Sequence, residues 1–569
     1  MKLRIPVLLA LVACGGTAAR PPGRVIISVV GTSDLHGHLM AEGDLGGVAL
    51  LAAYVANVRA ARAADGGGVV LVDGGDAFQG TLESNLAEGE AVVSVMNHLG
   101  YHAMAIGNHD FDYGPVGPAT SPRAPGDDPR GALKARAAQA HYPFLTSNVY
   151  EGGKPLAAPN IMPSTIVGVA GVQVGIVGAA TEDTPTSTSA PTWKGLELRP
   201  LAPSIAAEAS SLRKRGAQIV VLVAHAGLCR RTIDNEEIAH CQEGEIADVV
   251  RALPPGAVDV VVGGHTHMGV ATEIAGVPIV EGWKYDRGFG RVDLTLENGR
   301  IVGKKLYEPH LLCARVAPGT ERCDKGAPAG ERVAASYEGR PIVPDGAVAA
   351  IITPYCERAR SRREDKLGVH VASTVIKAYD EESPYGNLVA DLMRAARPAA
   401  DVAITNGGGL RTDLPAGDLS YGQVYEAYPF DNRFAEIRLS GRSLRSVIAA
   451  NLERPKGILS ISGVRAKAVC KGGALDVTLL RDDGRPVGDD ERLRIATSDF
   501  LAGSGMEGSL GGVKDVEIDI EEGTLVREEL ISILRKRGGV LAGDDPTLFD
   551  PTHRRLDYPG PRPVTCTVR

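Results

Sequence analysis

The sequence lacks an excess of basic charge, cysteines spaced as zinc ligands, and long apolar runs beyond its first residues. Its formal net charge is −8 at pH 7, which argues against a nucleic-acid polymer as partner, because such binding depends on basic surface. No Cys-x-x-Cys pair occurs among the eight cysteines, so a cysteine zinc site is not expected. No segment after the first 13 residues is long and apolar enough to span a membrane. The 44% hydrophobic and 23% charged residues are ordinary for a globular protein, and 569 residues predict two to four domains.

The first residues have the pattern of a secretory signal. Lys2 and Arg4 precede an apolar run from Ile5 to Ala13, which is shorter than the roughly 20 residues that a membrane-spanning helix needs. The run ends in Leu-Val-Ala-Cys14-Gly, which resembles the lipobox of bacterial lipoproteins. We therefore expect a lipid anchor on Cys14 and a location in the bacterial cell envelope, in the periplasm or at the cell surface. An ordinary secretory signal with an incidental cysteine, or an uncleaved anchor, is the alternative.

The other seven cysteines fit an oxidising compartment. Two pairs are close in the sequence: Cys229 with Cys241, and Cys313 with Cys323. Either pair could close a small loop as a disulfide. The other three are Cys356, Cys470 and Cys566. An odd total means at least one free thiol, and the pairing stays open.

Five apolar segments with strand character each run into a short polar cluster. The segments span residues 25–30, 68–72, 102–106, 218–223 and 258–262. The clusters contain, in order, Asp34 and His36, Asp76, Asn108 and His109, His225, and His265 and His267. Helical patterns at 48–64 and 91–99 separate the first strands, and this alternation predicts a layered α/β sheet. Because ligands of such sheets bind at the carboxyl ends of strands, we expect the clusters to meet in one site.

The residue types in these clusters point to metal ions. The candidate ligands are Asp34, His36, Asp76, Asn108, His225, His265 and His267. Oxygen and nitrogen ligands without sulfur suit zinc, manganese, iron or cobalt. Seven ligands are too many for one tetrahedral ion and match two divalent ions that share a carboxylate. Two ions roughly 3.5–4 Å apart can activate a water and stabilise both oxygens of an in-line displacement. Each residue alone has a structural alternative, such as a helix cap for either aspartate or a core histidine for His225.

The five clusters, in this order and spacing, resemble the signature of the calcineurin-like metallophosphoesterases. The segments Thr32-Ser-Asp-Leu-His-Gly37 and Gly107-Asn-His-Asp-Phe-Asp-Tyr-Gly114 resemble the 5′-nucleotidase family in particular. The resemblance implies a four-layer α/β/β/α sandwich in which Asp76 bridges the two metals. It assigns Asp34, His36 and His267 to one metal, and Asn108, His225 and His265 to the other. It also implies that His109 is catalytic and that Asp112 orients it.

The resemblance extends over the second half of the chain. Segments 383–391, 405–411, 428–432 and 498–503 resemble, in turn, the start of the family's C-terminal domain, its substrate-binding loop, and the two segments that supply stacking aromatics. The implied substrate-binding residues are Asn406, Gly408, Arg411, Phe430, Asn432 and Phe500. Two aromatic rings can sandwich a planar base, which contributes about 1–3 kcal/mol, and the guanidinium of Arg411 suits phosphate. The alternative is that Phe430 and Phe500 are core aromatics.

The chain therefore divides into four parts. Residues 1–24 form the signal and tether, 25–345 the metallophosphoesterase domain, 346–366 a linking helix, and 367–569 a smaller α/β substrate-binding domain. Two departures from the family concern the substrate. Where many members place a ribose-binding aspartate, this chain has Met506, or Glu507 with a one-residue shift. Where members that act on nucleoside monophosphates often carry arginines, it has the acidic stretch Asp380-Glu-Glu382.

The resulting hypothesis is a metal-dependent phosphoric ester hydrolase outside the cytoplasm. It would hydrolyse nucleotides to nucleoside and phosphate through a metal-activated water, without a covalent phosphoenzyme. One alternative is a 2′,3′-cyclic-nucleotide 2′-phosphodiesterase with 3′-nucleotidase activity, and a more distant one is a sulfur-ester hydrolase of the same fold. A lipid-anchored binding protein without catalysis is the alternative from another class. The expected partners are a small nucleotide and, through Cys14, a membrane; no protein partner is predicted.

Overall fold

The computed structural model describes residues 23–117, 122, 126–229, 238–324, 330–455, 457–503, 509–514 and 516–566. Three positions discussed above, Cys14, Met506 and Glu507, lie outside these ranges. No helix within the described ranges is long and apolar enough to cross a membrane.

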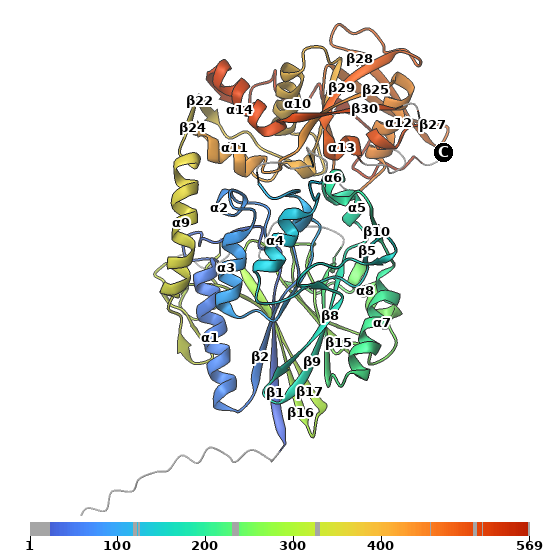
Figure 1. The fold of residues 1–569 in the computed structure, drawn as a ribbon. Helices are drawn as coiled ribbons and strands as arrows, with labels where there is room; N and C mark the ends of the chain where they lie inside the picture. Colours follow the sequence, from blue (N-terminus) through green and yellow to red (C-terminus); the bar gives the residue numbers. More distant parts are fainter. Residues whose placement is uncertain are drawn as a thin grey trace, which may run out of the picture.

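The N-terminal domain contains two seven-stranded sheets packed face to face (Figure 1). The first has the order β17-β16-β1-β2-β3-β4-β7 and the second β12-β14-β15-β13-β11-β9-β8. The first sheet comprises β1 (Arg24–Thr32), β2 (Gly68–Asp73), β3 (Ala103–Ala105), β4 (Phe144–Leu145), β7 (Ile161–Met162), β16 (Gly288–Glu297) and β17 (Arg300–Leu311). The second comprises β8 (Ser164–Val169), β9 (Val172–Ala180), β11 (Ile219–His225), β12 (Ile238–Ala239), β13 (Val260–Val262), β14 (Gly269–Ile274) and β15 (Val277–Gly282). Short strands at the periphery are β5 (Val149–Glu151), β6 (Lys154–Pro155), β10 (Leu196–Leu198), β18 (Arg315–Val316), β19 (Val333–Ala334), β20 (Ser336–Tyr337) and β21 (Arg340–Pro341).

Helices cover the outer face of each sheet, so the domain has four layers. The longer helices are α1 (Val48–Ala64), α3 (Glu90–Leu99), α4 (Gly131–Gln139), α7 (Leu201–Lys214) and α8 (Glu245–Ala252). The short helices α2 (Leu82–Asn85), α5 (Thr184–Ser187) and α6 (Ala190–Trp193) lie at the end of the domain that faces the C-terminal domain (Figure 1). Successive side chains of a strand point to opposite faces. Val29 and Val70 accordingly lie in the apolar layer between the sheets, whereas Val30 and Leu71 belong to the cluster that packs on the helices. The predicted α/β/β/α sandwich is confirmed.

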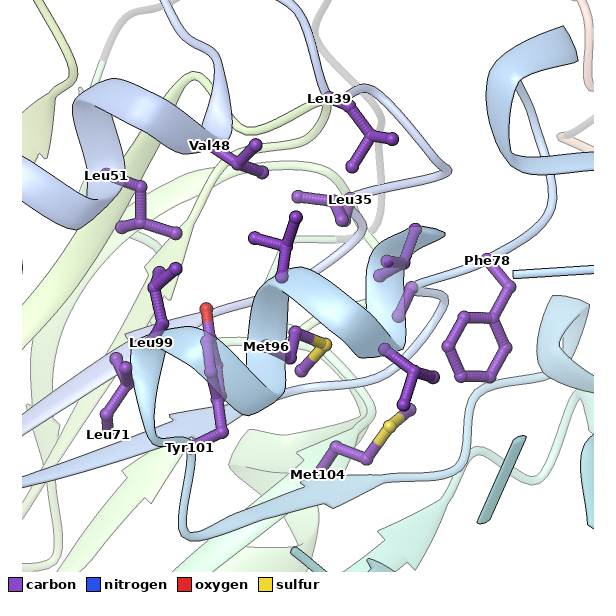
Figure 2. Packing of buried hydrophobic residues seen from close by; sticks show 14 of the residues in the cluster. Leu35, Leu39, Val48, Leu51, Leu71, Phe78, Met96, Leu99, Tyr101 and Met104 are labelled. Carbon is purple, nitrogen blue, oxygen red and sulfur yellow. The ribbon is translucent and has the colours of Figure 1, made fainter. Parts of the chain in front are cut away.

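The apolar cluster that packs against α3 also includes one side chain from the loop after β1 and one from the loop after β2. Leu35 and Phe78 are 5% and 0% exposed and belong to the same apolar cluster as Met96 and Leu99 of α3 (Figure 2). Leu35 lies between two candidate ligands, and Phe78 follows a third two residues later. Packing of these side chains therefore anchors the loops that carry the polar clusters.

The C-terminal domain is a smaller α/β unit, also as predicted. A five-stranded sheet has the order β26-β23-β29-β25-β30, and two three-stranded sheets have the orders β24-β22-β31 and β28-β27-β32. The strands are β22 (Lys366–Ser373), β23 (Val402–Asn406), β24 (Gly417–Ser420), β25 (Arg433–Ser440), β26 (Leu459–Ser462), β27 (Val464–Lys471), β28 (Ala474–Arg481), β29 (Arg492–Ser498), β30 (Glu517–Leu525), β31 (Gly539–Ala542) and β32 (Leu556–Asp557). The helices are α10 (Pro384–Ala396), α11 (Tyr421–Ala427), α12 (Gly441–Leu452), α13 (Asp499–Gly503) and α14 (Val526–Arg537).

Helix α9 (Gly346–Arg363) leads from one domain to the other along one side of the molecule (Figure 1). The Asp345 carboxylate caps its first turn by accepting from the backbone N–H groups of Ala347 and Val348. At its other end, the Arg363 guanidinium pairs with Glu83 of α2 and with Glu426 of α11. This helix therefore contacts both domains through its last turn.

The described residues form three disulfides. Both pairs that are close in the sequence form, Cys229 with Cys241 and Cys313 with Cys323. A third bridge joins Cys470 to Cys566 across a separation of 96 residues. Cys356 is the free thiol among the described residues.

Candidate metal centre and substrate site

The carboxyl ends of five parallel strands bring the predicted ligands into one site. β1, β2 and β3 run parallel in one sheet, and β11 and β13 run parallel in the other. Ligand atoms of Asp34, His36 and His267 all lie within 4.8 Å of one another, as do those of Asp34, Asp76 and His225. The Nε2 atom of His225 lies 3.0 Å from Asn108 Oδ1 and 3.3 Å from His265 Nδ1. All seven candidate ligands are therefore neighbours.

The loops that carry these ligands adopt backbone conformations that residues other than glycine seldom take. The φ angle is positive at Asp34 (55°), His36 (48°), Asp76 (55°), His265 (76°) and His267 (63°). Such residues cost about 1–3 kcal/mol each and persist only where their surroundings enforce them. Backbone bonds supply part of that constraint, because Asp34 N donates to Gly75 O and His36 N donates to Asp76 O, each at 2.9 Å. The ligand geometry is thus built into the loops themselves.

The hydrogen bonds of two histidines direct their lone pairs into the site. His36 Nδ1 lies 2.8 Å from the Gln79 carbonyl oxygen, and His225 Nδ1 lies 2.9 Å from that of Gly74. Since a carbonyl oxygen only accepts, each Nδ1 carries a proton, and Nε2 presents a lone pair when the ring is neutral. Nε2 of His225 faces two acceptors, the Asn108 oxygen at 3.0 Å and an Asp76 oxygen at 3.1 Å. Converging acceptors of this kind fit a bound cation.

The electrostatics of the cluster also favour positive charge. Burial raises the pKa of Asp34 to about 6, although His225 opposes the rise. Burial also disfavours charge on Asp76, but the neighbouring histidines hold the pKa of this carboxyl well below its usual range. Burial lowers the pKa of His225, yet the Asp76 and Asp34 carboxylates outweigh it and raise the pKa to about 10. For His36 and His267, burial lowers the pKa well below its usual range, so both rings are neutral and can act as ligands.

His109 and Asp112 form a hydrogen-bonded pair beside the ligand cluster. Nδ1 of His109 lies 2.7 Å from one Asp112 oxygen. The other oxygen of Asp112 accepts from the Thr188 hydroxyl at 3.2 Å and the Ser189 N–H at 3.4 Å. The backbone N–H of His109 donates to Asp76 at 2.8 Å. The position of the ring is therefore fixed at Nδ1 by the Asp112 carboxylate.

Two buried carboxylates accept hydrogen bonds from the loops that carry the candidate ligands. Asp110 accepts from the backbone N–H group of Gly107 in its own loop and from those of Asp76 and Ala77 in the loop after β2. Glu281, 1% exposed, accepts from Leu228 N at 2.6 Å and from the Thr266 hydroxyl at 2.8 Å. It thereby links the loop after β11 to the loop after β13. Glu281 could not be found from the sequence, because its two partners are 15 and 53 residues away in the chain and no local pattern marks them.

The C-terminal domain places Phe430, one of the predicted stacking aromatics, against the His109–Asp112 pair. The ring of Phe430 lies 5.4 Å from the His109 ring, centroid to centroid. The Arg411 guanidinium lies 5.0 Å from the Phe430 centroid, and its charge contributes to the lowered pKa of His36. Arg411 therefore faces the ligand cluster from the opposite domain. The Gln79 side chain, which sequence analysis missed, donates to the Pro429 carbonyl at 3.3 Å and joins the two domains at this point.

The other predicted substrate residues lie on neighbouring segments. A Cβ at Gly408 would meet the Asn406 side chain at 3.1 Å and the Tyr379 ring at 3.5 Å, so the loop packs closely without one. Asn432 hydrogen-bonds the Tyr428 side chain. Phe500 is half-buried, and its N–H donates to Asp499 Oδ1, which also accepts from Arg433 N beside the Phe430 segment.

Two carboxylates of the acidic stretch before α10 accept hydrogen bonds from other segments of the C-terminal domain. Glu382 is 5% exposed and accepts from Asn387 Nδ2 and from the backbone N–H groups of Arg555 and Leu556. Asp380 accepts from Gly457 N at 3.0 Å. Both carboxylates are thus engaged with the C-terminal domain itself. The expected effect of this stretch on phosphate recognition finds no support in the contacts of these two residues.

Comparison with known proteins gives two family matches. Residues 27–269 match the calcineurin-like phosphoesterases and residues 366–509 the 5′-nucleotidase C-terminal domain. The chain is 27% identical over 503 residues to Protein UshA of Yersinia enterocolitica, covering 84% of this chain and 85% of that protein. It is 26% identical over 460 residues to a 5′-nucleotidase of Vibrio cholerae, covering 75% and 76%.

Solved structures share the two-domain fold. The 5′-nucleotidase precursor from Thermus thermophilus matches with a TM-score of 0.70 at 23% identity, covering 94% of this chain and 99% of that one. The sulfate thiohydrolase SoxB from the same species matches with a TM-score of 0.65 at 18% identity, covering 95% and 98%. At these identities the likeness concerns the fold alone.

Proposed function

Since the chain belongs to the calcineurin-like phosphoesterases that carry a 5′-nucleotidase C-terminal domain, and is a phosphoric ester hydrolase, we propose that it removes phosphate from nucleotides outside the cytoplasm. The observation that carries the proposal is the contact between Phe430 and His109. It puts a ring that can stack on a base, from one domain, next to a histidine that can assist phosphoester cleavage, from the other. A phosphatase without preference for nucleotides has no need of such a contact.

The ligand cluster would hold two divalent ions, of zinc, manganese, iron or cobalt. The residues that would hold them are Asp34, His36, Asp76, Asn108, His225, His265 and His267. When bound, the ions supply Lewis acidity toward the phosphate oxygens and lower the pKa of a bound water.

The remaining steps belong to side chains of this chain. Arg411 would bind the phosphate or orient it, because its charge already faces the cluster. His109, held at Nδ1 by Asp112, would donate a proton from Nε2 to the departing ester oxygen. Phe430 and Phe500 would hold the base, so that binding energy from the nucleoside positions the phosphate.

Location outside the cytoplasm is supported by two independent features. The first residues have a secretory pattern with Cys14 in a lipobox-like sequence. Six cysteines form disulfides in the described residues, which is typical of an oxidising compartment. We propose that the protein is exported and anchored by a lipid on Cys14.

The direct test is a phosphate-release assay on the purified protein with manganese or zinc. We expect release from 5′-AMP, and loss of that activity in Asp76→Asn and His109→Ala. Release from 3′-AMP and 2′,3′-cyclic AMP without release from 5′-AMP would favour the cyclic phosphodiesterase and reject the proposal. Activity of Asp76→Asn equal to that of the parent would show that the site is misassigned.

A further inference from the structure

One buried arginine holds the segment that carries Phe430. Arg527 lies in the first turn of α14 and is 3% exposed. Its Nη1 donates to the carbonyl oxygens of Pro429 at 2.8 Å and Phe430 at 3.2 Å, and its Nη2 pairs with the Asp431 carboxylate. Its guanidinium also lies 4.1 Å from the centroid of the Tyr425 ring. A single side chain thus contacts three consecutive residues.

Regular secondary structure does not hold this segment in place. Residues 429–432 lie between α11 and β25 and belong to no helix or strand. Their carbonyl groups therefore lack the regular partners of a sheet or helix. The start of α14 supplies the missing partners, since Val526 N also donates to Asn432 O at 2.8 Å. From the other domain, Gln79 adds its bond to the Pro429 carbonyl.

The contacts of Arg527 with Pro429, Phe430 and Asp431, here called the clamp, require an arginine. Burying a positive charge is unfavourable unless its N–H groups are paired, and here two carbonyl oxygens and the carboxylates of Asp431 and Glu528 pair them. The planar guanidinium reaches several acceptors at fixed angles, whereas a lysine ammonium is a compact donor on a flexible stem. A lysine at this position keeps the charge and loses the simultaneous contacts.

We propose that Arg527 is a positioning residue for base recognition, which fixes Phe430 so that its ring can stack on the base of a nucleotide. This inference rests on the proposed function and goes beyond it. It predicts that Arg527 matters for substrates with an aromatic base and not for sugar phosphates without one. Arg527 contacts neither the ligand cluster nor the His109–Asp112 pair, so it acts on the substrate only through the segment it holds.

The test compares 5′-AMP with ribose 5-phosphate in three variants of the full-length protein: Arg527→Lys, Phe430→Ala and the double substitution. We expect Arg527→Lys to lower kcat/KM for 5′-AMP about fivefold or more, mainly through KM, in line with the stacking of one base. We expect less than a twofold change for ribose 5-phosphate. The double variant should be no worse than Phe430→Ala, because both changes remove the same interaction.

Arg397→Lys is the matched control. The Arg397 guanidinium lies 3.9 Å from the centroid of Phe434 and pairs with Glu521. Phe434 is 0% exposed and lies in the core, so this control changes an arginine over an aromatic ring without touching the site. It should leave the ratio of the two kcat/KM values unchanged.

Asp431→Ala and adenosine binding keep the proposal testable if Arg527→Lys folds poorly or ribose 5-phosphate is a poor substrate. Asp431→Ala removes one arm of the clamp and should shift the same ratio by a smaller factor. The Kd of adenosine, measured by calorimetry, should rise by the factor by which KM for 5′-AMP rises. Equal losses on both substrates, or additive losses in the double variant, would overturn the role of Arg527. If Phe430→Ala itself showed no preference between the substrates, the nucleotide assignment would fail instead.

Discussion

Replacing Asp112 with asparagine tests the assignment of His109 as a proton donor. In the structure, one Asp112 oxygen lies 2.7 Å from His109 Nδ1, and the two side chains are 15% and 17% exposed. A ring that donates from Nε2 while Nδ1–H bonds a carboxylate carries a positive charge, which the carboxylate stabilises. Asparagine has the same shape but no charge. A hydrogen bond to a charged group contributes about 1.5–3 kcal/mol, so kcat for 5′-AMP should fall about 10- to 150-fold.

The assay separates proton donation from general damage by changing the leaving group. The KM for 5′-AMP should stay within about threefold, because Asp112 lies on the His109 side and not in the segments assigned to the base. p-Nitrophenyl phosphate releases an anion that needs no proton, so its hydrolysis should fall much less in Asp112→Asn. Asp550→Asn is the matched control, since Asp550 pairs with His553 at 2.8 Å with the same spacing of three residues, far from the site in sequence and on the surface. Equal losses on both esters, or no loss on 5′-AMP, would refute proton donation by His109.

Three further predictions concern stability and metal binding. Replacing both Cys470 and Cys566 with alanine opens a loop with a sequence separation of 96. The free energy of unfolding, measured by urea denaturation, should fall by up to about 4.7 kcal/mol. The Cys313/Cys323 double variant, with a separation of 10, should lower this free energy by less. Glu281→Ala leaves two buried donors unpaired and should weaken metal affinity about 10- to 100-fold in a chelator competition, whereas unchanged affinity would exclude a role in orienting the ligands. Removal of divalent ions with a chelator should abolish phosphate release, and manganese or zinc should restore it if the cluster holds the ions.

The metal ligands could be proposed from the sequence because their arrangement leaves a local trace. Each candidate follows an apolar strand within a few residues, and parallel strands end at the same edge of their sheet. That regularity brings Asp34, Asp76 and His225 within 4.8 Å of one another although they are far apart in the chain. The type of chemistry follows from the side chains alone, since oxygen and nitrogen donors without sulfur have few other uses in such a pattern.

Contacts between distant segments have no local pattern in the sequence that would predict them. Cys470 and Cys566 pair because strand β27 and the end of the chain come together, which only the folded C-terminal domain shows. Glu382 was interpreted as a residue that could affect phosphate recognition, but it binds the backbone of residues 555 and 556. A single sequence gives the charge of a side chain and not the direction in which it points.

The Pro429 carbonyl oxygen accepts hydrogen bonds from both domains. It accepts from Gln79 of the N-terminal domain at 3.3 Å and from Arg527 of the C-terminal domain at 2.8 Å. The backbone carbonyl of the same Gln79 accepts from Nδ1 of His36, a candidate metal ligand. One residue therefore contacts a candidate ligand through its backbone and the segment 429–432 through its side chain. The backbone contact does not depend on residue type. A substitution of Gln79 can therefore change the contact between the domains without altering the contact with His36. In this way substrate choice can diverge in this fold while the reaction stays the same.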